Sequence, residues 1–269
     1  MKQQWLIMQS MIIGDFLLEQ GISQKAIKAI KMHGDIQVNG HHQTVRYLLQ
    51  PGEVLTIQYP PEKNQMTPVD IPLQIVYEDD YLLIIDKPAG LPSIPTRGHP
   101  LYTLANALTF YYQKIHLDST IHLVNRLDKE TSGLMIVAKY RYIHDRMMKD
   151  LGHIERRYQA HVQGVIETNG TIRLPIYKEP FQMKRLIDER GQEACTHYQV
   201  YQTQKNCTLM RMKLETGRTH QIRVHMAAIG HPLVGDSLYG DGQGIFDLDS
   251  YMVGFIHPIT KQKIVITKK

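Results

Sequence analysis

An acidic and a basic side chain, Asp128 and Arg126, stand two residues apart in the stretch "HLVNRLDKETSGLMIVAK". The polar connection that carries them follows one apolar segment, and Gly133 can relieve its backbone before the apolar run from Leu134 to Ala138 begins. A carboxylate on such a connection, at the end of buried strands, is held firmly yet open to a cleft, as a nucleophile or general base must be. The competing interpretation is a solvated turn, since most charged loops simply face water.

A second group of candidate residues lies in "GRTHQIRVHMAAIGHPLVGD", residues 217–236. The spacing of its apolar positions predicts a helix that carries Arg223, with Thr219 as its N-terminal cap. Arg218 stands where a strand gives way to this helix, and from there a guanidinium could grip a carboxylate of another loop with two hydrogen bonds. Alternatively, Arg218 and His220 are surface residues without such a partner.

A third candidate is Tyr158 in "ERRYQAHVQG". The stretch alternates with a period of two, which places Tyr158, Ala160 and Val162 on one face of a strand and Arg157 on the other. We therefore expect Tyr158 to face inward. Core packing of its ring is the ordinary explanation, but a buried hydroxyl needs a partner, which a carboxylate in a cleft would supply.

The segments that must position these side chains form two units joined by a linker. From residue 73 onward, short strand-like segments alternate with helical stretches near residues 104–115, 143–151 and 221–229. This pattern predicts an α+β catalytic domain, residues 73–269, with a large and mostly antiparallel mixed sheet. Residues 60–72 are rich in proline and polar side chains and predict a linker.

Residues 10–59 predict a small α+β module of their own. Ser23 can cap a helix from Gln24 to His33, and the pair Asn39-Gly40 favours a tight hairpin turn between two strands. A shorter helix comes first, and Gly21 stands where a left-handed residue commonly ends one.

The second of these helices carries Lys25, Lys28 and Lys31 at intervals of three residues, which makes a basic stripe. In isolation such a stripe is usually a solvated face. However, the order of helix, turn, basic helix and hairpin resembles the αL RNA-binding module of a small-subunit ribosomal protein and of tyrosyl-tRNA synthetases. That resemblance implies that the basic helix lies on RNA, although Gln24 and Lys25 stand where an arginine pair is common.

Length and composition narrow the class of protein. The 269 residues are enough for one substantial core and a small module, and the net charge of +5 would attract a polyanion if it were clustered. Cys195 and Cys207 lie twelve residues apart in the sequence, which argues against a disulfide framework and against a thiolate zinc site. No apolar run approaches the ~20 residues of a membrane span. We expect a soluble, cytoplasmic protein.

The three segments with candidate chemistry, in this order, resemble the RluA-type family of RNA pseudouridine synthases. The correspondence runs from about Tyr77 to Ile266 and includes "IDKPAGLPSIP" and "GFIHPIT". The stretches "NRLDKETSGLMIVAK" and "GRTHQIRVHMAAIGHPLVGD" carry most of its specificity. Asn125 departs from the family pattern, because histidine often occupies its position.

The resemblance implies a nucleophilic role for Asp128, which takes part in breaking the bond from the uracil nitrogen to ribose before the base reattaches through carbon. It further implies that Arg126 replaces the flipped uridine in the RNA stack, that Arg218 pairs with the aspartate, and that Tyr158 lies over the uracil. Flipping costs about a few kcal/mol, which the wedge and phosphate contacts must offset. No cofactor is implied, because isomerisation needs neither redox chemistry nor hydrolysis.

The predicted partner is RNA, with large-subunit ribosomal RNA favoured and transfer RNA as the alternative. The RNA-binding residues that we predict are Arg126, Lys25, Lys28, Lys31, Arg223 and His220. A metal-dependent nuclease or phosphatase is disfavoured, because the fourteen histidines show no metal-ligand spacing. A catalytically silent RNA-binding or ribosome assembly protein is the other alternative. A monomer is the default expectation.

Overall fold

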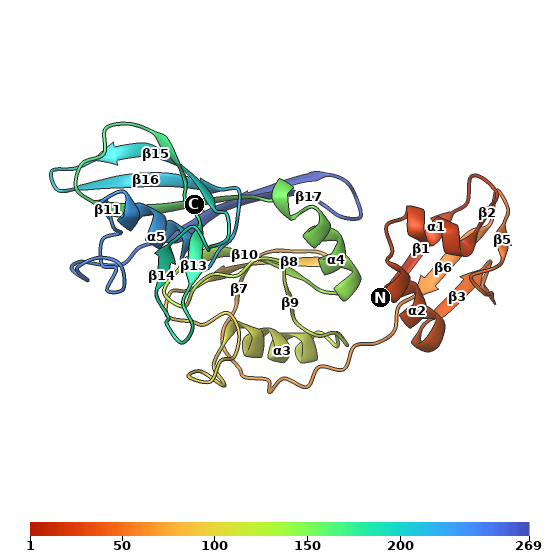
Figure 1. Ribbon diagram of the computed structural model, residues 1–269. Helices are drawn as coiled ribbons and strands as arrows, with labels where there is room; N and C mark the ends of the chain where they lie inside the picture. Colours follow the sequence, from red (N-terminus) through yellow and green to blue (C-terminus); the bar gives the residue numbers. More distant parts are fainter. Residues whose placement is uncertain (269) are drawn as a thin grey trace.

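The computed structural model describes residues 1–268, which form a small N-terminal module and a larger sheet domain (Figure 1). The small module contains a four-stranded sheet in the order β1-β6-β3-β4, a separate pair of strands, β2 and β5, and two helices. Its elements are β1 (Lys2–Leu6), β2 (Met11–Ile12), α1 (Ile13–Glu19), α2 (Gln24–His33), β3 (Asp35–Val38), β4 (His41–His42), β5 (Leu48–Leu49) and β6 (Val54–Gln58).

Local sequence signals explain the shape of this module. The Ser23 side chain accepts a hydrogen bond from the Ala26 amide and begins α2. Asn39 and Gly40, with φ of 50° and 84°, form the predicted turn between β3 and β4. The module also begins earlier than residue 10, because β1 pairs with β6 along its whole length.

The segment predicted to be a linker contains no helix or strand between residues 59 and 73, but it is anchored to the sheet domain. The Asn106 side chain donates to the Thr67 carbonyl at 2.7 Å. Glu62 contacts the His122 ring at 2.7 Å and accepts from the Arg141 amide at 3.1 Å. This segment is therefore a strap bound to the surface of the sheet domain, and it is not a flexible tether.

The large domain is α+β, with a ten-stranded sheet that is antiparallel except where β10 meets β17. The main path runs β12-β15-β16-β11-β17-β10-β8-β7, with β18 added to β17 and β9 to β10. The strands are β7 (Gln74–Glu78), β8 (Leu82–Lys87), β9 (His122–Leu123), β10 (Ser132–Ala138), β11 (Glu155–Gln163), β12 (Gly170–Arg173), β15 (Cys195–Thr203), β16 (Cys207–Leu214), β17 (Asp249–Ile256) and β18 (Lys263–Thr267). Two short strands, β13 (Ile176–Lys178) and β14 (Arg185–Ile187), make a separate hairpin.

Both faces of the centre of this sheet are buried, which explains the unbroken apolar run of β10. Leu134 and Ile136 belong to the cluster that packs under α4 (Arg141–Lys149). Met135 and Val137, on the opposite face, pack with α3 (Leu104–Lys114) and with α5 (Gln221–Ala228). A short 3-10 helix, η1 (Leu151–His153), follows α4.

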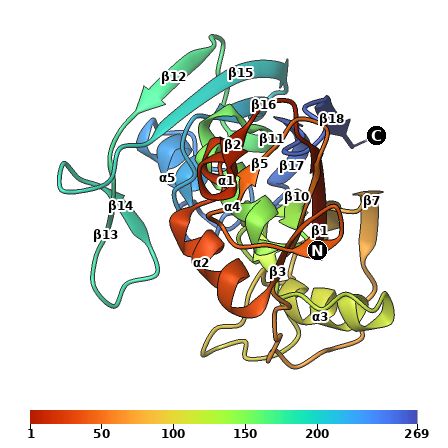
Figure 2. The same ribbon diagram turned by 90° about the vertical axis from the view of Figure 1, so that its right-hand side faces the viewer.

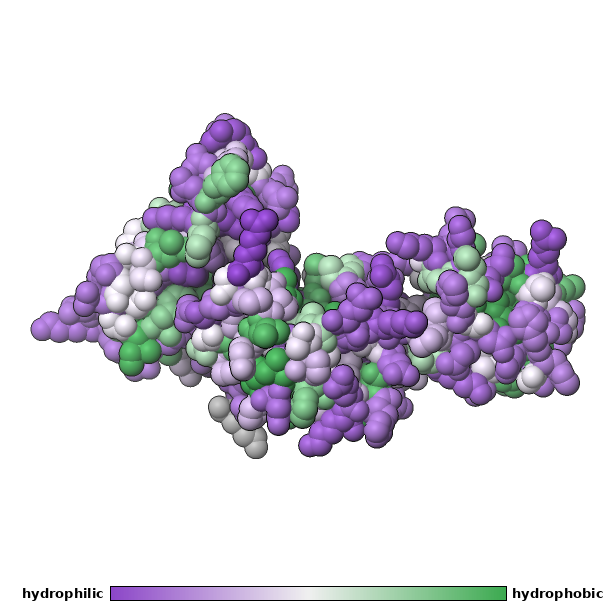
Figure 3. Space-filling view, turned by 90° about the horizontal axis from the view of Figure 1, so that it is seen from below, coloured by the Kyte–Doolittle hydropathy of each residue, from purple (hydrophilic) through white to green (hydrophobic). Residues whose placement is uncertain are grey.

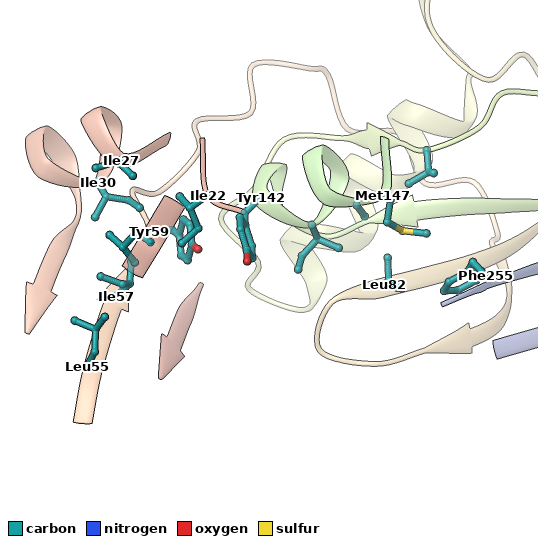
Figure 4. Close-up of a cluster of buried hydrophobic side chains, with 14 of the residues drawn as sticks. Ile22, Ile27, Ile30, Leu55, Ile57, Tyr59, Leu82, Tyr142, Met147 and Phe255 are labelled. Atoms are coloured by element: carbon teal, nitrogen blue, oxygen red, sulfur yellow. The ribbon is translucent and has the colours of Figure 1, made fainter. Parts of the chain in front are cut away.

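The small module is docked on α4. The ring centroids of Tyr59 and Tyr142 lie 5.0 Å apart, and one buried apolar cluster continues from the module through these rings into the sheet domain (Figure 4). Arg146 and Lys149 donate to the carbonyls at the end of α1, those of Gln20 and Gly21, at 3.2 and 2.9 Å. Figure 2 shows the module in front of the sheet domain, and Figure 3 shows the two bodies joined across a narrower waist.

Several strands were not predicted from the sequence. The largest omission is β17, a central strand that pairs with β10, β11 and β18. Its Gly254 lowers intrinsic strand propensity, so its place depends on tertiary contacts. Within residues 1–268, no helix is long and apolar enough to cross a membrane.

Candidate active site

The connection that carries Asp128 lies between β9 and β10 and is tied to β10 by Asn125. The Asn125 side-chain oxygen accepts the Ile136 amide at 2.7 Å, and the Val124 amide donates to the Ile136 carbonyl at 2.9 Å. Asn125 is buried and therefore acts as a strut for the loop. Gly133 has a φ of 109°, and a Cβ there would lie 2.4 Å from the Ser250 carbonyl, so only glycine permits β10 to approach β17 this closely.

A second loop, after β8, holds the Asp128 connection from beneath. The Lys87 ammonium is fully buried and donates to the carbonyls of Pro88, Leu91 and Lys129 at 2.8, 2.8 and 3.2 Å. Gly90 also donates its amide to the Lys129 carbonyl at 2.8 Å. Burial lowers the pKa of Lys87 to about 8, while the nearby acids Glu130 and Asp128 oppose that shift. The loop backbone is thus fixed at the residue next to the acid.

Asp128 opens into a cleft of about 600 Å³, whose wall includes Arg126, Tyr158, His220 and Arg223. About 30% of the Asp128 side chain is exposed. The cleft joins the loop after β9 to the start of α5 and the middle of β11, segments far apart in the sequence. Both α4 and η1 contribute to its rim through His144, Met148 and Leu151.

Tyr158 faces inward as predicted, with 6% of its surface exposed. Burial raises the pKa of its phenol, the Arg156 charge opposes that shift, and the Asp128 charge adds to it. The phenol is therefore neutral at physiological pH. Ala160 and Val162 continue the same buried face along β11.

Arg223 is a buried cation in the lining of the cleft. It forms a two-point ion pair with Asp236, with Nε and Nη2 each 2.7 Å from a carboxylate oxygen. Burial opposes its charge, but the bonds to Asp236 and the charge of Asp128 outweigh burial and raise the pKa of Arg223. The same hydrogen bonds lower the pKa of Asp236 against the cost of its own burial. The cleft therefore holds a permanent positive charge whose field reaches Asp128.

Among the basic side chains of residues 1–268, only His220 comes within 4.0 Å of the Asp128 carboxylate, with Nε2 at 3.9 Å from Oδ2. It adopts a left-handed backbone, φ 58°, immediately before α5, and its Nδ1 lies 2.9 Å from the Tyr239 hydroxyl. Burial lowers the pKa of this imidazole, Asp128 opposes that shift, and the charge of Arg223 adds to it. His220 is therefore neutral at neutral pH.

Two predictions for the segment before α5 are wrong. Arg218 does not pair with Asp128: it is exposed, and its Nε donates to the Glu193 carbonyl at 3.1 Å. Thr219 does not cap the helix, which begins two residues later. The N-cap residue is His220, whose side chain makes no capping hydrogen bond, and the Gln221 side chain instead accepts the Arg218 amide at 2.9 Å. Arg218 precedes the helix and stays exposed where it lines the cleft, whereas Arg223 lies on the buried face of the helix.

The predicted RNA contacts fall into two places. Arg126, Arg223 and His220 line the cleft, and the exposed Arg126 forms no ion pair within residues 1–268. The lysine stripe lies exposed on α2 of the small module, outside the cleft lining. Lys25, Lys28 and Lys31 alternate there with the buried Ile27 and Ile30.

Three residues of the site were missed. Arg156 is 5% exposed, and its Nη1 would lie 2.9 Å from a Cβ at position 217, so Gly217 makes room for this guanidinium. Extending the alternation of β11 by one step would have found it. No local signal marks Lys87 or Asp236, because only the fold buries the Lys87 ammonium and places Asp236 beside Arg223.

Comparisons with known proteins agree with this geometry. Residues 81–228 match the family model of RNA pseudouridylate synthase. The chain is 40% identical over 264 residues to the uncharacterized RNA pseudouridine synthase YjbO of Bacillus subtilis, covering 94% of this chain and 93% of that protein. It is 37% identical over 264 residues to the ribosomal large subunit pseudouridine synthase D of Vibrio cholerae, covering 90% and 82%. The fold matches the structure of human RNA Pseudouridylate Synthase Domain Containing 1 with a TM-score of 0.60 at 24% identity, over 74% of this chain and 83% of that one.

Proposed function

The chain belongs to the RNA pseudouridylate synthase family, and we propose that it isomerises uridines of large-subunit ribosomal RNA with Asp128 as the nucleophile. The name of the relative in Vibrio cholerae supports the choice of RNA. The observation that carries the proposal is the position of Asp128. Its carboxylate is partly exposed at a cleft large enough for a flipped nucleotide, on a loop that Lys87 and Asn125 hold rigidly.

The reaction breaks the bond from uracil N1 to ribose C1′ and forms a bond from uracil C5 to C1′. The proton on C5 leaves, and N1 gains a proton, so no oxidant or leaving group is required. Asp128 takes part in the bond cleavage as the nucleophile. The neutral phenol of Tyr158 packs against the detached base and offers a hydrogen bond while the base turns.

Arg223 supplies the positive charge that the sequence had assigned to Arg218. Because Asp236 holds its guanidinium at two points, the cation stays in one orientation without occupying the Asp128 carboxylate. A fixed charge of this kind stabilises negative charge on the uracil after its bond to ribose breaks. We therefore propose Arg223 as the electrostatic partner of the nucleophile.

Two further elements contact RNA in this proposal. Arg126, exposed at the cleft beside the nucleophile, fills the space that the extruded uridine leaves in the stack. The lysine stripe of α2 binds phosphates at a second place, which extends the footprint beyond the cleft. The expectations of a monomer and of a cytoplasmic location rest on the sequence alone.

The choice of RNA is tested by mapping pseudouridines in cells that lack the gene and in cells that regain it. Loss of sites in large-subunit ribosomal RNA, restored by the gene, is the expected result. Loss confined to transfer RNA would replace the proposed substrate with the alternative one. Unchanged sites together with defective ribosome assembly would support the silent RNA-binding protein.

A further inference from the structure

Three side chains of different chemistry meet on the outer part of the sheet, away from the Asp128 loop. Cys195 and His197 stand two residues apart on one face of β15, and Glu215 follows the end of the neighbouring strand, β16. The His197 Nε2 atom lies 3.8 Å from the Cys195 sulfur and 2.6 Å from Glu215 Oε1. One ligand atom from each of the three residues fits within 4.8 Å of the others.

We propose that Cys195, His197 and Glu215 bind a divalent cation of the zinc class. Thiolate, imidazole and carboxylate are the three ligand types that zinc takes in proteins, and three protein ligands leave a fourth position for water. Tetrahedral bonds of about 2.0 to 2.3 Å separate neighbouring ligand atoms by roughly 3.3 to 3.8 Å. The sulfur and the nitrogen already have that separation, whereas the nitrogen and the carboxylate oxygen must move apart by roughly 1 Å.

The neighbouring residues prepare His197 for this role. The Thr171 hydroxyl, on β12, lies 2.8 Å from Nδ1, so Nε2 is the ring nitrogen that faces the sulfur and the carboxylate. Hydrogen bonds of this kind orient metal-binding histidines in proteins generally. Cys195 is 4% exposed and lies at the inner side of the group, whereas His197 and Glu215 lie toward solvent, which leaves a path for the ion.

One charge opposes the cation. Arg173 lies 3.3 and 3.5 Å from the two oxygens of Glu215, which are long contacts on an exposed pair. Glu215 can turn one oxygen to the metal while the other keeps the arginine. Cys195 binds a metal as the thiolate and releases its proton to solvent. Removal of the Arg173 charge should strengthen binding.

The site also has a structural connection to the cleft. The Cys195 amide donates to Thr216 Oγ1 at 3.1 Å, and its carbonyl accepts a hydrogen bond from the Gln221 side chain at 2.9 Å. A metal bridging Cys195 and Glu215 would therefore fasten β15 to residues 215–221, the segment that contains His220. Its role would be to stiffen this wall, and the proposal does not depend on the identity of the RNA substrate.

This group could not be recognised from the sequence alone. Cys195 and Cys207 predicted no thiolate zinc site, because their spacing matches no pair of zinc-binding cysteines. The fold provides the other two ligands. They are His197, on the same strand face as Cys195, and Glu215, twenty residues after Cys195 in the chain. A Cys-x-His pair on a strand is too short a motif to identify a site without the neighbouring strand.

The test uses the full-length protein, freed of metal and titrated with Co²⁺ as a spectroscopic probe for zinc. We expect one ion per chain, a sulfur-to-cobalt charge-transfer band in the near ultraviolet, and displacement of Co²⁺ by Zn²⁺. Cys195→Ser should abolish the band, and Cys207→Ser, which removes the other cysteine, should retain it. His197→Gln and Glu215→Gln should each weaken Zn²⁺ binding, and Thr171→Val should weaken it roughly tenfold or more.

Circular dichroism and denaturant unfolding without added metal show that each variant is folded. The proposal is overturned if folded wild-type protein shows no charge-transfer band, or if the band is the same in Cys195→Ser. A band that disappears only in Cys207→Ser would overturn it as well. None of these readouts requires the RNA substrate, so failure of the metal site and failure of the proposed function remain distinguishable.

Discussion

The His220 imidazole lies between the nucleophile and a tyrosine, with Nε2 at 3.9 Å from Asp128 Oδ2 and Nδ1 at 2.9 Å from the Tyr239 hydroxyl. The Tyr239 hydroxyl in turn accepts the Arg185 amide at 2.7 Å, which connects this series of contacts to the β13-β14 hairpin. The uncharged state of His220 leaves the Asp128 carboxylate without an ion pair. The protonation state of His220 should therefore control how the rate decreases at low pH.

The pH dependence follows from the sign of the shift. Burial places the pKa of His220 below its ordinary value of 6.5, so the ring stays neutral until the pH falls below that value. The imidazolium formed there would pair with Asp128 and withdraw it from the substrate. We expect the kcat/KM of the wild-type enzyme to decrease at pH values below 6.5, as the imidazole becomes protonated. In His220→Gln, kcat/KM should stay constant down to a lower pH. Identical acid limbs in the two enzymes would contradict this role.

Asp236→Asn should damage both the fold and the reaction. The substitution leaves the buried Arg223 without a counter-charge, which typically costs about 3 to 5 kcal/mol of stability. Denaturant unfolding measures that loss. Asp241→Asn is the matched control, because Asp241 is exposed and bonds only to exposed groups, the Gln163 side chain and the Gln243 amide. If the two variants unfold at the same denaturant concentration, the Arg223–Asp236 pair does not hold the cleft together.

Replacing the three lysines of α2 with glutamine should weaken RNA binding by reducing its electrostatic part. Each phosphate contact contributes roughly 0.7 to 0.9 to the slope of log affinity against log salt, so the slope should decrease by up to about 2 to 3. The measurement is the affinity for substrate RNA at a series of salt concentrations. Glutamine at Lys63, Lys114 and Lys205, exposed on other segments, is the control and should change the slope less.

Arg146→Ala combined with Lys149→Ala should loosen the small module. The double variant removes both side-chain bonds from α4 to the end of α1, while the Tyr59–Tyr142 contact remains. Amide hydrogen exchange should accelerate in α1 and α4, since fewer contacts protect them. Arg141→Ala is the control on the same helix, because Arg141 pairs only with Asp145 among its side-chain ion pairs. If amide exchange in α1 and α4 is as slow in the double variant as in Arg141→Ala, docking depends on the apolar contact alone.

Sequence reasoning was strongest where the signal is local. The bounds of α2, the Asn39-Gly40 turn and the inward position of Tyr158 follow from capping, turn chemistry and alternation over a few residues. The choice between Arg218 and Arg223 could not be made in this way. Both lie in one stretch and both line the cleft, and only the fold buries Arg223 against Asp236 while Arg218 stays exposed.

Contacts between distant segments could not be predicted from the sequence, because the signals there are local. Nothing near Lys87 in the chain shows that its ammonium would hold the carbonyl of Lys129. Glu62, predicted to lie in a linker, contacts His122 because the strap passes along the sheet domain. Such pairs depend on the packing of β8, β9 and β10, and no motif of a few residues encodes them.

The most direct test of the account compares wild-type protein with Asp128→Asn on the RNA whose pseudouridines depend on the gene. Both turnover and RNA affinity are measured for each protein. The substitution keeps the shape of the side chain and removes its nucleophilic charge, so turnover should disappear while RNA affinity remains nearly unchanged. Retained pseudouridine formation, or a comparable loss of both turnover and affinity, would contradict the assignment of Asp128 as the nucleophile.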